Sequence, residues 1–351
     1  MKPYQAMEAR YPHAPDVLER EVAEQGFAAG WCLQGKPVPA YYFDCHVHLG
    51  NLGAQGIADA LAPDAAVART MDVRRALLIL RLGAETADAA PEDAAMAGRD
   101  ASYSLNELGR LIAGLPDPDL LVPALWWPYR APHAEQVAQA AQMGVRCIKL
   151  HNAPVICQAA PPDLWLSPGW TDAFAAMARH GLPVLWHVTQ RLPSNAYTGG
   201  GRNTYWREGW ANGAQYGNEE LLQSFLTCCA RNPSVPFIGA HQLHVGWERL
   251  DRLFAGYPNL YVDTTVGCVL RPEDTFYPHD KAFLRDVFIQ WADRLLFGTD
   301  VFWPDGDGAE VRATTAMHQR FLAHLDLPDD VLQKVCHGNA ERLLGLAPLT
   351  K

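Results

Sequence analysis

Two histidines spaced two residues apart, His46 and His48, follow an apolar segment at residues 40–43. Side chains of a β-strand alternate between its two faces, so two imidazoles at this spacing point to the same side. Such a pair offers two nitrogen ligands to one metal ion. The same alternation places Cys45 on the opposite face, in the core. The motif therefore predicts half of a metal site, and the other ligands must come from elsewhere in the chain.

Three further polar residues suited to metal binding or catalysis stand at the ends of later apolar runs: His187, His241 and Asp300. Three imidazoles and one carboxylate suit a borderline divalent ion, for which Zn²⁺ is our first expectation and Mn²⁺ the alternative. The expected ligands of one such ion are His46, His48, His187 and Asp300. A position left open in this set would hold a water whose pKa falls from about 15.7 to roughly 7.

Two of these residues are expected to take part in the reaction itself. Asp300 ends the segment 295–300, and its carboxylate is suited both to bind the metal and to carry a proton from water to a leaving group. His241 ends the segment 237–241, where it would polarise the carbonyl of a substrate. We therefore predict that His241 and Asp300 are the catalytic pair.

The elements that must position these residues alternate along the chain. Short apolar runs predict eight strands, at 41–45, 76–80, 121–126, 147–150, 184–186, 237–240, 260–263 and 295–297. Segments with a helical period lie between them, at 102–115, 135–143, 170–180, 218–232, 247–255, 279–292 and 309–325. This alternation implies parallel strands with helical crossovers, and eight units fit a (β/α)8 TIM barrel of typically ~250 residues plus insertions. An open doubly wound sheet is the chief rival, which the lack of a Gly-x-Gly-x-x-Gly loop after an early strand disfavours.

Several segments interrupt the alternation. Residues 1–39 predict a helical extension packed on the barrel, which makes residues 40–351 the expected barrel domain. Residues 50–72, after the first strand, are rich in Gly, Ala and Asp, and residues 83–101 are rich in Ala, Asp and Glu and are interpreted as a loop. The longest, at 188–217, follows the fifth strand and contains a cluster of glycines and several aromatic residues. In a barrel it would lie above the active face, so we expect it to decide the substrate.

Composition excludes some classes of partner. Hydrophobic residues make up 49% and charged residues 19% of the chain, which is typical of a globular protein. A net charge of −10 without a basic run argues against nucleic acid, and no apolar run approaches the ~20 residues of a membrane span. Eight scattered cysteines without a leader sequence favour reduced thiols and a cytoplasmic location. The expected partner is a small-molecule substrate, and the acidic, Trp-rich chain is compatible with a homo-oligomer.

Five residues near predicted strand ends are candidates for contacts with that substrate: Arg81, Trp127, Arg130, His151 and His244. Either arginine would clamp a carboxylate through bidentate hydrogen bonds, and the alternative for each is a surface ion pair. Trp127 is one of several tryptophans near strand ends, which together indicate a pocket for a flat or aromatic substrate. The two histidines either line the site or hold a loop.

These motifs together resemble the amidohydrolase superfamily, in particular its metal-dependent amidohydrolase and decarboxylase branch, which includes aminocarboxymuconate-semialdehyde decarboxylase. The matching pieces are FDCHVH at 43–48, GVRCIKLH at 144–151, PVLWH at 183–187, IGAH at 238–241, LFGTD at 296–300 and GNAERLLGL at 338–346. The resemblance implies a TIM barrel and a catalytic His241. It also implies the metal ligands His46, His48, His187 and Asp300.

The resemblance adds one more candidate, Lys149, which stands where binuclear members of the superfamily carry a carboxylated lysine that bridges two metals. The mononuclear branch also shows a lysine in this motif. We therefore expect one metal ion, with a second ion bridged by Lys149 as the alternative.

Two reactions fit the same ligands. The first is hydrolysis, in which metal-activated water attacks an amide or lactone carbonyl of a small, flat or carboxylated substrate. The alternative is non-oxidative decarboxylation of an aromatic or unsaturated carboxylic acid. A non-enzymatic metal-binding barrel would explain the ligands but not the additional histidine beside them. A serine hydrolase is disfavoured because no Gly-x-Ser-x-Gly elbow occurs.

Overall fold

The structure is a computed structural model that describes residues 41–50, 57–82, 102–127, 130–152, 161, 163–189, 218–245, 247–265, 281–304 and 308–349. Three predicted segments lie outside these residues: the N-terminal extension at 1–39, the whole loop at 83–101, and residues 190–217 of the long loop. The predicted division of the chain at residue 40 therefore stays a prediction.

The described strands form one sheet in which every neighbouring pair is parallel. They are β1 (Tyr42–Leu49), β2 (Val73–Leu82), β3 (Ser102–Tyr103), β4 (Leu121–Trp126), β5 (Cys147–His151), β6 (Val184–His187), β7 (Phe237–Gly239), β8 (Leu260–Asp263), β9 (Leu295–Leu296) and β10 (Val301–Trp303). Their order is β10-β1-β2-β4-β5-β6-β7-β8-β9, with β3 beside β2. Each of the eight predicted strands is confirmed, and the chain adds β3 and β10.

The eighth barrel position is filled by one segment that contains both β9 and β10. On one side, Thr264 N–H donates to Leu296 O at 2.8 Å, next to the ladder between β8 and β9. On the other side, Cys45 N–H donates to Phe297 O at 2.9 Å, and β10 continues along β1. Because this segment bonds to the last strand and to the first, it joins the two ends of the sheet, as a TIM barrel requires.

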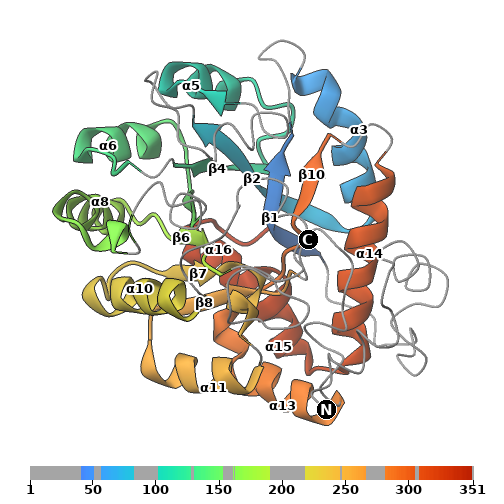
Figure 1. Cartoon of the computed structure of the whole chain (residues 1–351). Helices are drawn as coiled ribbons and strands as arrows, with labels where there is room; N and C mark the ends of the chain where they lie inside the picture. The colour runs from blue at the N-terminus through green and yellow to red at the C-terminus, as the bar shows by residue number, and fades with distance from the viewer. Residues whose placement is uncertain are drawn as a thin grey trace, which may run out of the picture.

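Helices surround the strands as an outer ring (Figure 1). They are α3 (Ile57–Thr70), α5 (Leu105–Ala113), α6 (Ala134–Gln142), α8 (Pro168–Arg179), α10 (Asn218–Arg231), α11 (Trp247–Gly256), α13 (Lys281–Gln290) and α14 (Ala309–His324), followed by α15 (Asp329–Gln333) and α16 (Asn339–Leu343). Residues 50–72, which interrupt the predicted alternation, contain α3. Within the described part of the chain, no helix is both long and apolar enough to cross a lipid bilayer.

The apolar core has two layers. Inside the barrel, inward side chains such as Phe43, Ile79 and Leu185 pack together with Leu343 and Leu344 from the C-terminal end of the chain. Helix α16 thus covers the end of the barrel opposite the strands' carboxyl ends. The larger layer lies between the sheet and the surrounding helices. Both layers exclude water, so polar groups at the carboxyl ends of the strands stand on a rigid base.

Candidate metal centre

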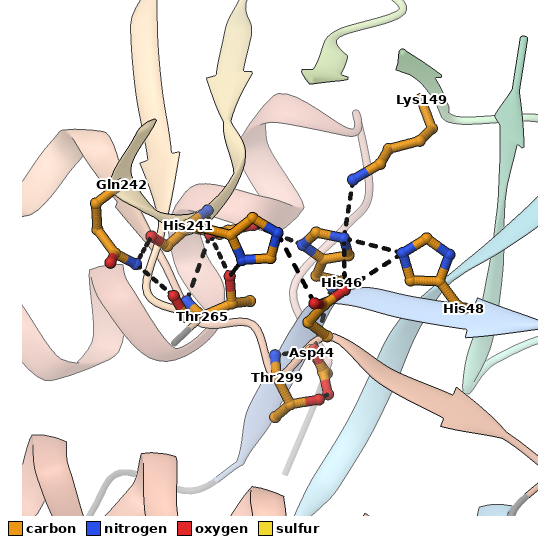
Figure 2. A network of polar contacts seen from close by, with 10 residues as sticks. Asp44, His46, His48, Lys149, His241, Gln242, Thr265 and Thr299 are labelled. Atoms are coloured by element: carbon orange, nitrogen blue, oxygen red, sulfur yellow. Dashed lines mark hydrogen bonds and ion pairs between the residues drawn. The ribbon is translucent and has the colours of Figure 1, made fainter. Parts of the chain in front are cut away.

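Three side chains converge at the carboxyl ends of the first and last strand positions. His46 Nε2 lies 3.2 Å from His48 Nε2 and 3.1 Å from Asp300 Oδ1, and His48 Nε2 lies 3.3 Å from the same oxygen. All three residues are buried. Figure 2 shows the two rings from β1 turned toward one point. Two nitrogens and one oxygen at these separations form a group that could hold a metal ion.

A local irregularity in β1 turns both histidines inward. The pairing of β1 with β2 shifts register between Asp44 and Val47. Cys45 packs among the side chains inside the barrel, whereas Val47 packs in the outer layer. Cys45 is a core residue as expected, but it does not lie on the face opposite to the two histidines, because the strand does not alternate strictly here. Burial raises the pKa of its thiol well above the usual range, so Cys45 is a core residue and not a nucleophile.

The position of Asp300 depends on the chain between β9 and β10. Asp300 has a left-handed backbone, with φ of 61°, and its N–H donates to His46 O at 2.7 Å. The segment that carries Asp300 can lie this close to β1 because Gly298 has no side chain. A Cβ there would lie 2.9 Å from Thr265 Cγ2 and 3.2 Å from both Cys45 Sγ and His46 Cβ. Glycine at this position thus allows the last strand to bring its carboxylate to the first.

Asp44 adds a second connection between these two strands. Its carboxylate accepts hydrogen bonds from Thr299 Oγ1 at 2.5 Å, from Thr299 N–H at 3.0 Å and from His46 N–H at 3.1 Å. Burial raises the pKa of Asp44 to about 7, against the opposing effect of the Thr299 hydrogen bonds. Both Asp44 and Thr299 therefore support the backbone that carries His46 and Asp300.

Asp263, at the end of β8, was not identified from the sequence. Its Oδ2 lies 2.8 Å from His46 Nδ1, and its Oδ1 accepts from His241 N–H at 2.7 Å and from Thr265 Oγ1 at 2.8 Å. The available signal was the polar run Asp263-Thr264-Thr265 directly after an apolar strand. A carboxylate that hydrogen-bonds a ligand histidine is a recurring part of metal sites in proteins.

His241 lies on a left-handed turn after β7. Residues 241–244 have φ between 50° and 58°, a conformation that costs non-glycine residues roughly 1–2 kcal/mol each. Gly239 makes the turn possible, since a Cβ there would lie 2.4 Å from Leu243 Cδ2. The turn brings His241 Nε2 to 3.8 Å from Asp300 Oδ2, and its ring centroid lies 5.3 Å from that of His46. Strained backbone of this kind is often found at functional sites.

Three further histidines, His151, His187 and His244, lie at the same end of the barrel. The rings of His151 and His187, on the neighbouring strands β5 and β6, stack at 4.3 Å between centroids. The ring of His187 lies 4.8 Å from that of His241, and the rings of His241 and His244 stack at 5.1 Å. His187 is partly exposed and is not part of the compact group of His46, His48 and Asp300 found among the described residues. Its role as a fourth ligand therefore stays a prediction.

The candidate substrate contacts separate into two groups. Arg81 is buried, and its guanidinium carbon lies 4.9 Å from the ring centroid of Trp126. The Trp126 ring in turn stacks on His151 at 5.5 Å and meets His48 edge-on at 5.8 Å. The structure thus brings Arg81 to the histidine cluster through Trp126.

The two other candidates differ from Arg81 in their surroundings. Trp127, the tryptophan named from the sequence, packs instead in the layer between the sheet and the helices. The side chains of adjacent strand residues point to opposite faces, so Trp126 takes the inward place. Arg130 is exposed, in contrast to Arg81.

Lys149 reaches the site from β5. Its side chain is buried, and its Nζ lies 2.9 Å from His46 Nε2 (Figure 2). The amine therefore points at the same nitrogen that faces His48 and Asp300. This position is compatible with a lysine that contacts a metal once it is carboxylated, and equally with an amine that stays unmodified.

The electrostatics of the cluster favour neutral imidazoles around one anionic carboxylate. Burial lowers the pKa of four histidines from the usual value: His46, His151, His187 and His241. Burial alone would raise the pKa of Asp300. The imidazoles of His46 and His241 and a hydrogen bond with His48 outweigh it and hold that pKa well below its usual range. Neutral imidazoles and an ionised carboxylate are the protonation states that metal ligands need.

The residues present fit a divalent cation. In a tetrahedral site with ligands about 2.1 Å from zinc, neighbouring ligand atoms are roughly 3.4 Å apart, close to the separations within the group. The hydrogen bond from His46 Nδ1 to Asp263 leaves Nε2 with its lone pair directed at the other two donors. The composition of the group, two imidazoles and a carboxylate, suits zinc and other borderline ions.

Comparison with known proteins agrees with this architecture. The profile of the amidohydrolase family matches residues 43–346, which is most of the sequence. This protein therefore belongs to the amidohydrolase family. No curated protein matches the sequence significantly.

Solved structures with the same fold include three bacterial proteins. A putative amidohydrolase from Staphylococcus aureus matches with a TM-score of 0.55 and 15% identity, over 87% of this chain and all of that one (100%). A dihydroorotase from Campylobacter jejuni matches with a TM-score of 0.53 and 13% identity, over 90% and 87% of the two chains. Amidohydrolase 2 from Bifidobacterium longum subsp. infantis matches with a TM-score of 0.50 and 17% identity, over 88% and 100%. At these identities the likeness concerns the fold alone.

Proposed function

We propose that this protein is a metal-dependent hydrolase in which water attacks the amide or lactone carbonyl of a small carboxylated substrate. The observation that carries the proposal is the convergence of His46, His48 and Asp300 at separations of 3.1–3.3 Å. It occurs at the carboxyl ends of the strands, where TIM-barrel enzymes hold their active sites.

The proposed cation is Zn²⁺, with Mn²⁺ as the alternative, held by the three residues of the group and by His187 as the fourth ligand. When bound, it would supply Lewis-acid chemistry, lowering the pKa of a water and polarising the carbonyl. Lys149 is proposed to stay unmodified beside one ion, and a second equivalent of metal would instead assign it as a carboxylated bridge.

Asp300 is proposed as the residue that moves the proton. Its low pKa keeps it ionised near neutral pH, so it can accept a proton from the attacking water. The water oxygen forms the new bond to carbon, the bond to the leaving nitrogen or oxygen breaks, and the proton passes to the leaving group. His241 completes the acid–base pair, because its Nε2 lies 3.8 Å from Asp300 Oδ2.

A carboxylated substrate is proposed because of Arg81. Its buried guanidinium lies against Trp126, whose ring contacts His48. Arginine is suited to bind a carboxylate through two parallel hydrogen bonds, and the neighbouring aromatic ring suits a flat body. These contacts support a small acid that is flat near its carboxylate.

The experiment that tests the proposal uses purified, zinc-loaded protein and a panel of amides, lactones and aromatic carboxylic acids. We expect release of acid or amine that stops on chelation and returns with metal. Release of CO₂ in its place would assign the protein as a decarboxylase, a reaction that the same ligands on the same fold can serve.

A matched variant separates an enzyme from a metal-binding protein. His241→Asn is expected to keep the metal content of the wild type and to lose turnover, because it leaves His46, His48 and Asp300 in place. Unchanged turnover in this variant would remove His241 from the proposed mechanism.

A further inference from the structure

We propose that Asp263 is a positioning residue that fixes two rings at once, so that His46 and His241 both turn an unprotonated Nε2 toward Asp300. Asp263 is a buried carboxylate that lies outside the sequence motifs carrying the predicted metal ligands. Its purpose rests on the proposed metal-dependent function, but the arrangement of protons can be measured independently of any metal.

The first contact fixes His46. Asp263 is fully buried (0% exposed), and its Oδ2 lies 2.8 Å from His46 Nδ1. An ionised carboxylate only accepts hydrogen bonds, so the ring must carry its proton on Nδ1 to satisfy this contact. The neutral ring then keeps a lone pair on Nε2, the nitrogen that lies 3.1 Å from Asp300 Oδ1 and 3.2 Å from His48 Nε2.

The second oxygen of the same carboxylate holds the backbone of His241. Asp263 Oδ1 accepts from His241 N–H at 2.7 Å, and so joins the end of β8 to the turn that follows β7. The amide of Gln242 donates to the carbonyl oxygens of Asp263 at 2.7 Å and of Thr265 at 2.8 Å (Figure 2). These bonds hold the left-handed turn at residues 241–244, whose conformation is intrinsically unfavourable.

Thr265 carries the influence of Asp263 to the His241 ring. Its Oγ1 lies 2.8 Å from Asp263 Oδ1 and 2.7 Å from His241 Nδ1. The hydroxyl has one proton, and the carboxylate is the stronger acceptor because the bond is charge-assisted. The hydroxyl therefore donates to Asp263 and accepts from Nδ1–H of His241. A proton on Nδ1 leaves the lone pair of this second ring on Nε2 as well.

This arrangement changes the role expected for His241. In the neutral form with Nδ1 protonated, the ring accepts a proton at Nε2 and donates none there. It therefore acts as a base facing Asp300 and does not polarise a carbonyl as a hydrogen-bond donor. Both rings present lone pairs to the same space, which suits a cation or a water held beside Asp300.

The direct test is ¹⁵N NMR of the protein labelled at histidine, recorded without metal and after zinc loading. The signals are assigned by comparison with His46→Asn and His241→Asn. We expect the proton on Nδ1 in both rings, with Nε2 unprotonated. A proton on Nε2 of His46 in the metal-free protein would overturn the proposal.

Two substitutions test separately how Asp263 acts on His46 and how it acts, through Thr265, on His241. Asn at position 263 has one acceptor oxygen, so it cannot serve both His46 Nδ1 and His241 N–H. We expect Asp263→Asn to lower zinc affinity about 10- to 100-fold, measured by competition with a coloured chelator. Thr265→Val removes the hydroxyl, and with it the bonds to His241 Nδ1 and to Asp263 Oδ1, but it leaves the contact between Asp263 Oδ2 and His46 Nδ1 in place. We expect this variant to keep the zinc affinity of the wild type. In the ¹⁵N spectra we expect the ring signals of His241 to shift and those of His46 to stay in place.

The outcomes also distinguish this proposal from the proposed function. Wild-type protein that binds no zinc contradicts the metal-dependent function, and the metal-free spectra still decide the role of Asp263. Zinc affinity that is unchanged in folded Asp263→Asn, with His46 still protonated on Nδ1, contradicts the positioning role. Circular dichroism checks folding, and if Asp263→Asn does not fold, the wild-type spectra decide.

Discussion

The N–H of Asp300 donates a hydrogen bond to the carbonyl oxygen of His46 at 2.7 Å, so the last strand position is fixed against the first at the level of the site. The same two residues meet through their side chains, at 3.1 Å. A displacement of either strand would therefore change the separation of the donor atoms directly. The barrel's closure and the metal site thus depend on the same contacts.

Gly298→Ala is expected to disturb both the closure of the barrel and the metal site. The added methyl would lie 2.9 Å from Thr265 Cγ2 and 3.2 Å from His46 Cβ. Overpacking of this kind costs about 1–3 kcal/mol of unfolding free energy, and we expect zinc content to fall with it. Gly256→Ala, at the end of α11, is the matched control, because nothing lies within 4 Å of its Cβ position. Equal zinc content and stability in the two variants would contradict the dependence of the site on this close approach.

A buried ion pair at the opposite end of the barrel should affect stability without affecting the site. Glu341 accepts from Tyr41 Oη at 2.6 Å and from Arg75 Nη1 at 2.7 Å, and all three side chains are buried. Glu341→Gln leaves the buried guanidinium without its counter-charge, which costs about 3–5 kcal/mol. Urea unfolding measures the loss, and zinc content is expected to stay at the wild-type level in the folded variant.

The control for this prediction is Glu219→Gln, which removes an exposed ion pair with Arg249. Exposed pairs contribute about 0–1 kcal/mol, so this variant should be close to the wild type in unfolding free energy. Similar losses in the two variants would show that burial does not set the strength of the Glu341 pair.

His318, a buried residue of α14, should make stability depend on pH. Burial lowers its pKa from 6.5 to about 4, despite a hydrogen bond with Thr314 O. Between these values the unfolded chain binds a proton that the folded protein does not, so the free energy of unfolding falls as pH falls from 6.5 to 4. The difference of about 2.5 pH units corresponds to about 3 kcal/mol at the lower end.

The measurement is the free energy of unfolding against pH for the wild type and for His318→Asn. Other buried histidines contribute to both curves, so the difference between the curves isolates His318. We expect the variant to show a shallower slope between pH 4 and 6.5, by about one proton. Parallel curves in this range would show that His318 does not titrate as its burial requires.

Arg81→Lys tests the carboxylate contact of the proposed function. Lysine keeps the charge but loses the planar pair of donors that binds a carboxylate at two points. For an acidic substrate identified in the panel, we expect KM to rise about 10- to 100-fold, the effect of losing a hydrogen bond between charged groups. Arg130→Lys, at an exposed position, should leave KM unchanged. A rise in KM for Arg130→Lys alone would move the carboxylate contact to that residue.

Much of the fold could be predicted because the barrel repeats a local pattern. Each buried strand is a short apolar run, and each polar residue that follows it, such as His187 or Asp300, marks the carboxyl end. Helix α3 could not be predicted in this way, because its sequence consists largely of small residues and contains Pro63. Its formation depends on packing against the barrel, where Leu61 and Ala68 are buried.

The contacts that support the site could not be predicted from patterns in the sequence. The contact between His46 and Asp263 joins residues 217 positions apart, and no spacing rule connects them. The inward position of Cys45 follows from a register shift in β1, which breaks the alternation on which the prediction relied. Trp126 packs with the side chains inside the barrel and Trp127 packs in the outer layer, and this difference between adjacent residues depends on the register of the strand.

The most direct test of the central claim is the metal content of the purified protein after equilibration with zinc and removal of free ion, compared with the double variant His46→Asn/His48→Asn. We predict one equivalent of zinc per chain in the wild type and far less than one in the variant. Zinc retained at the wild-type level in a folded double variant would show that the two imidazoles of β1 do not hold the ion, and the proposed mechanism would fail.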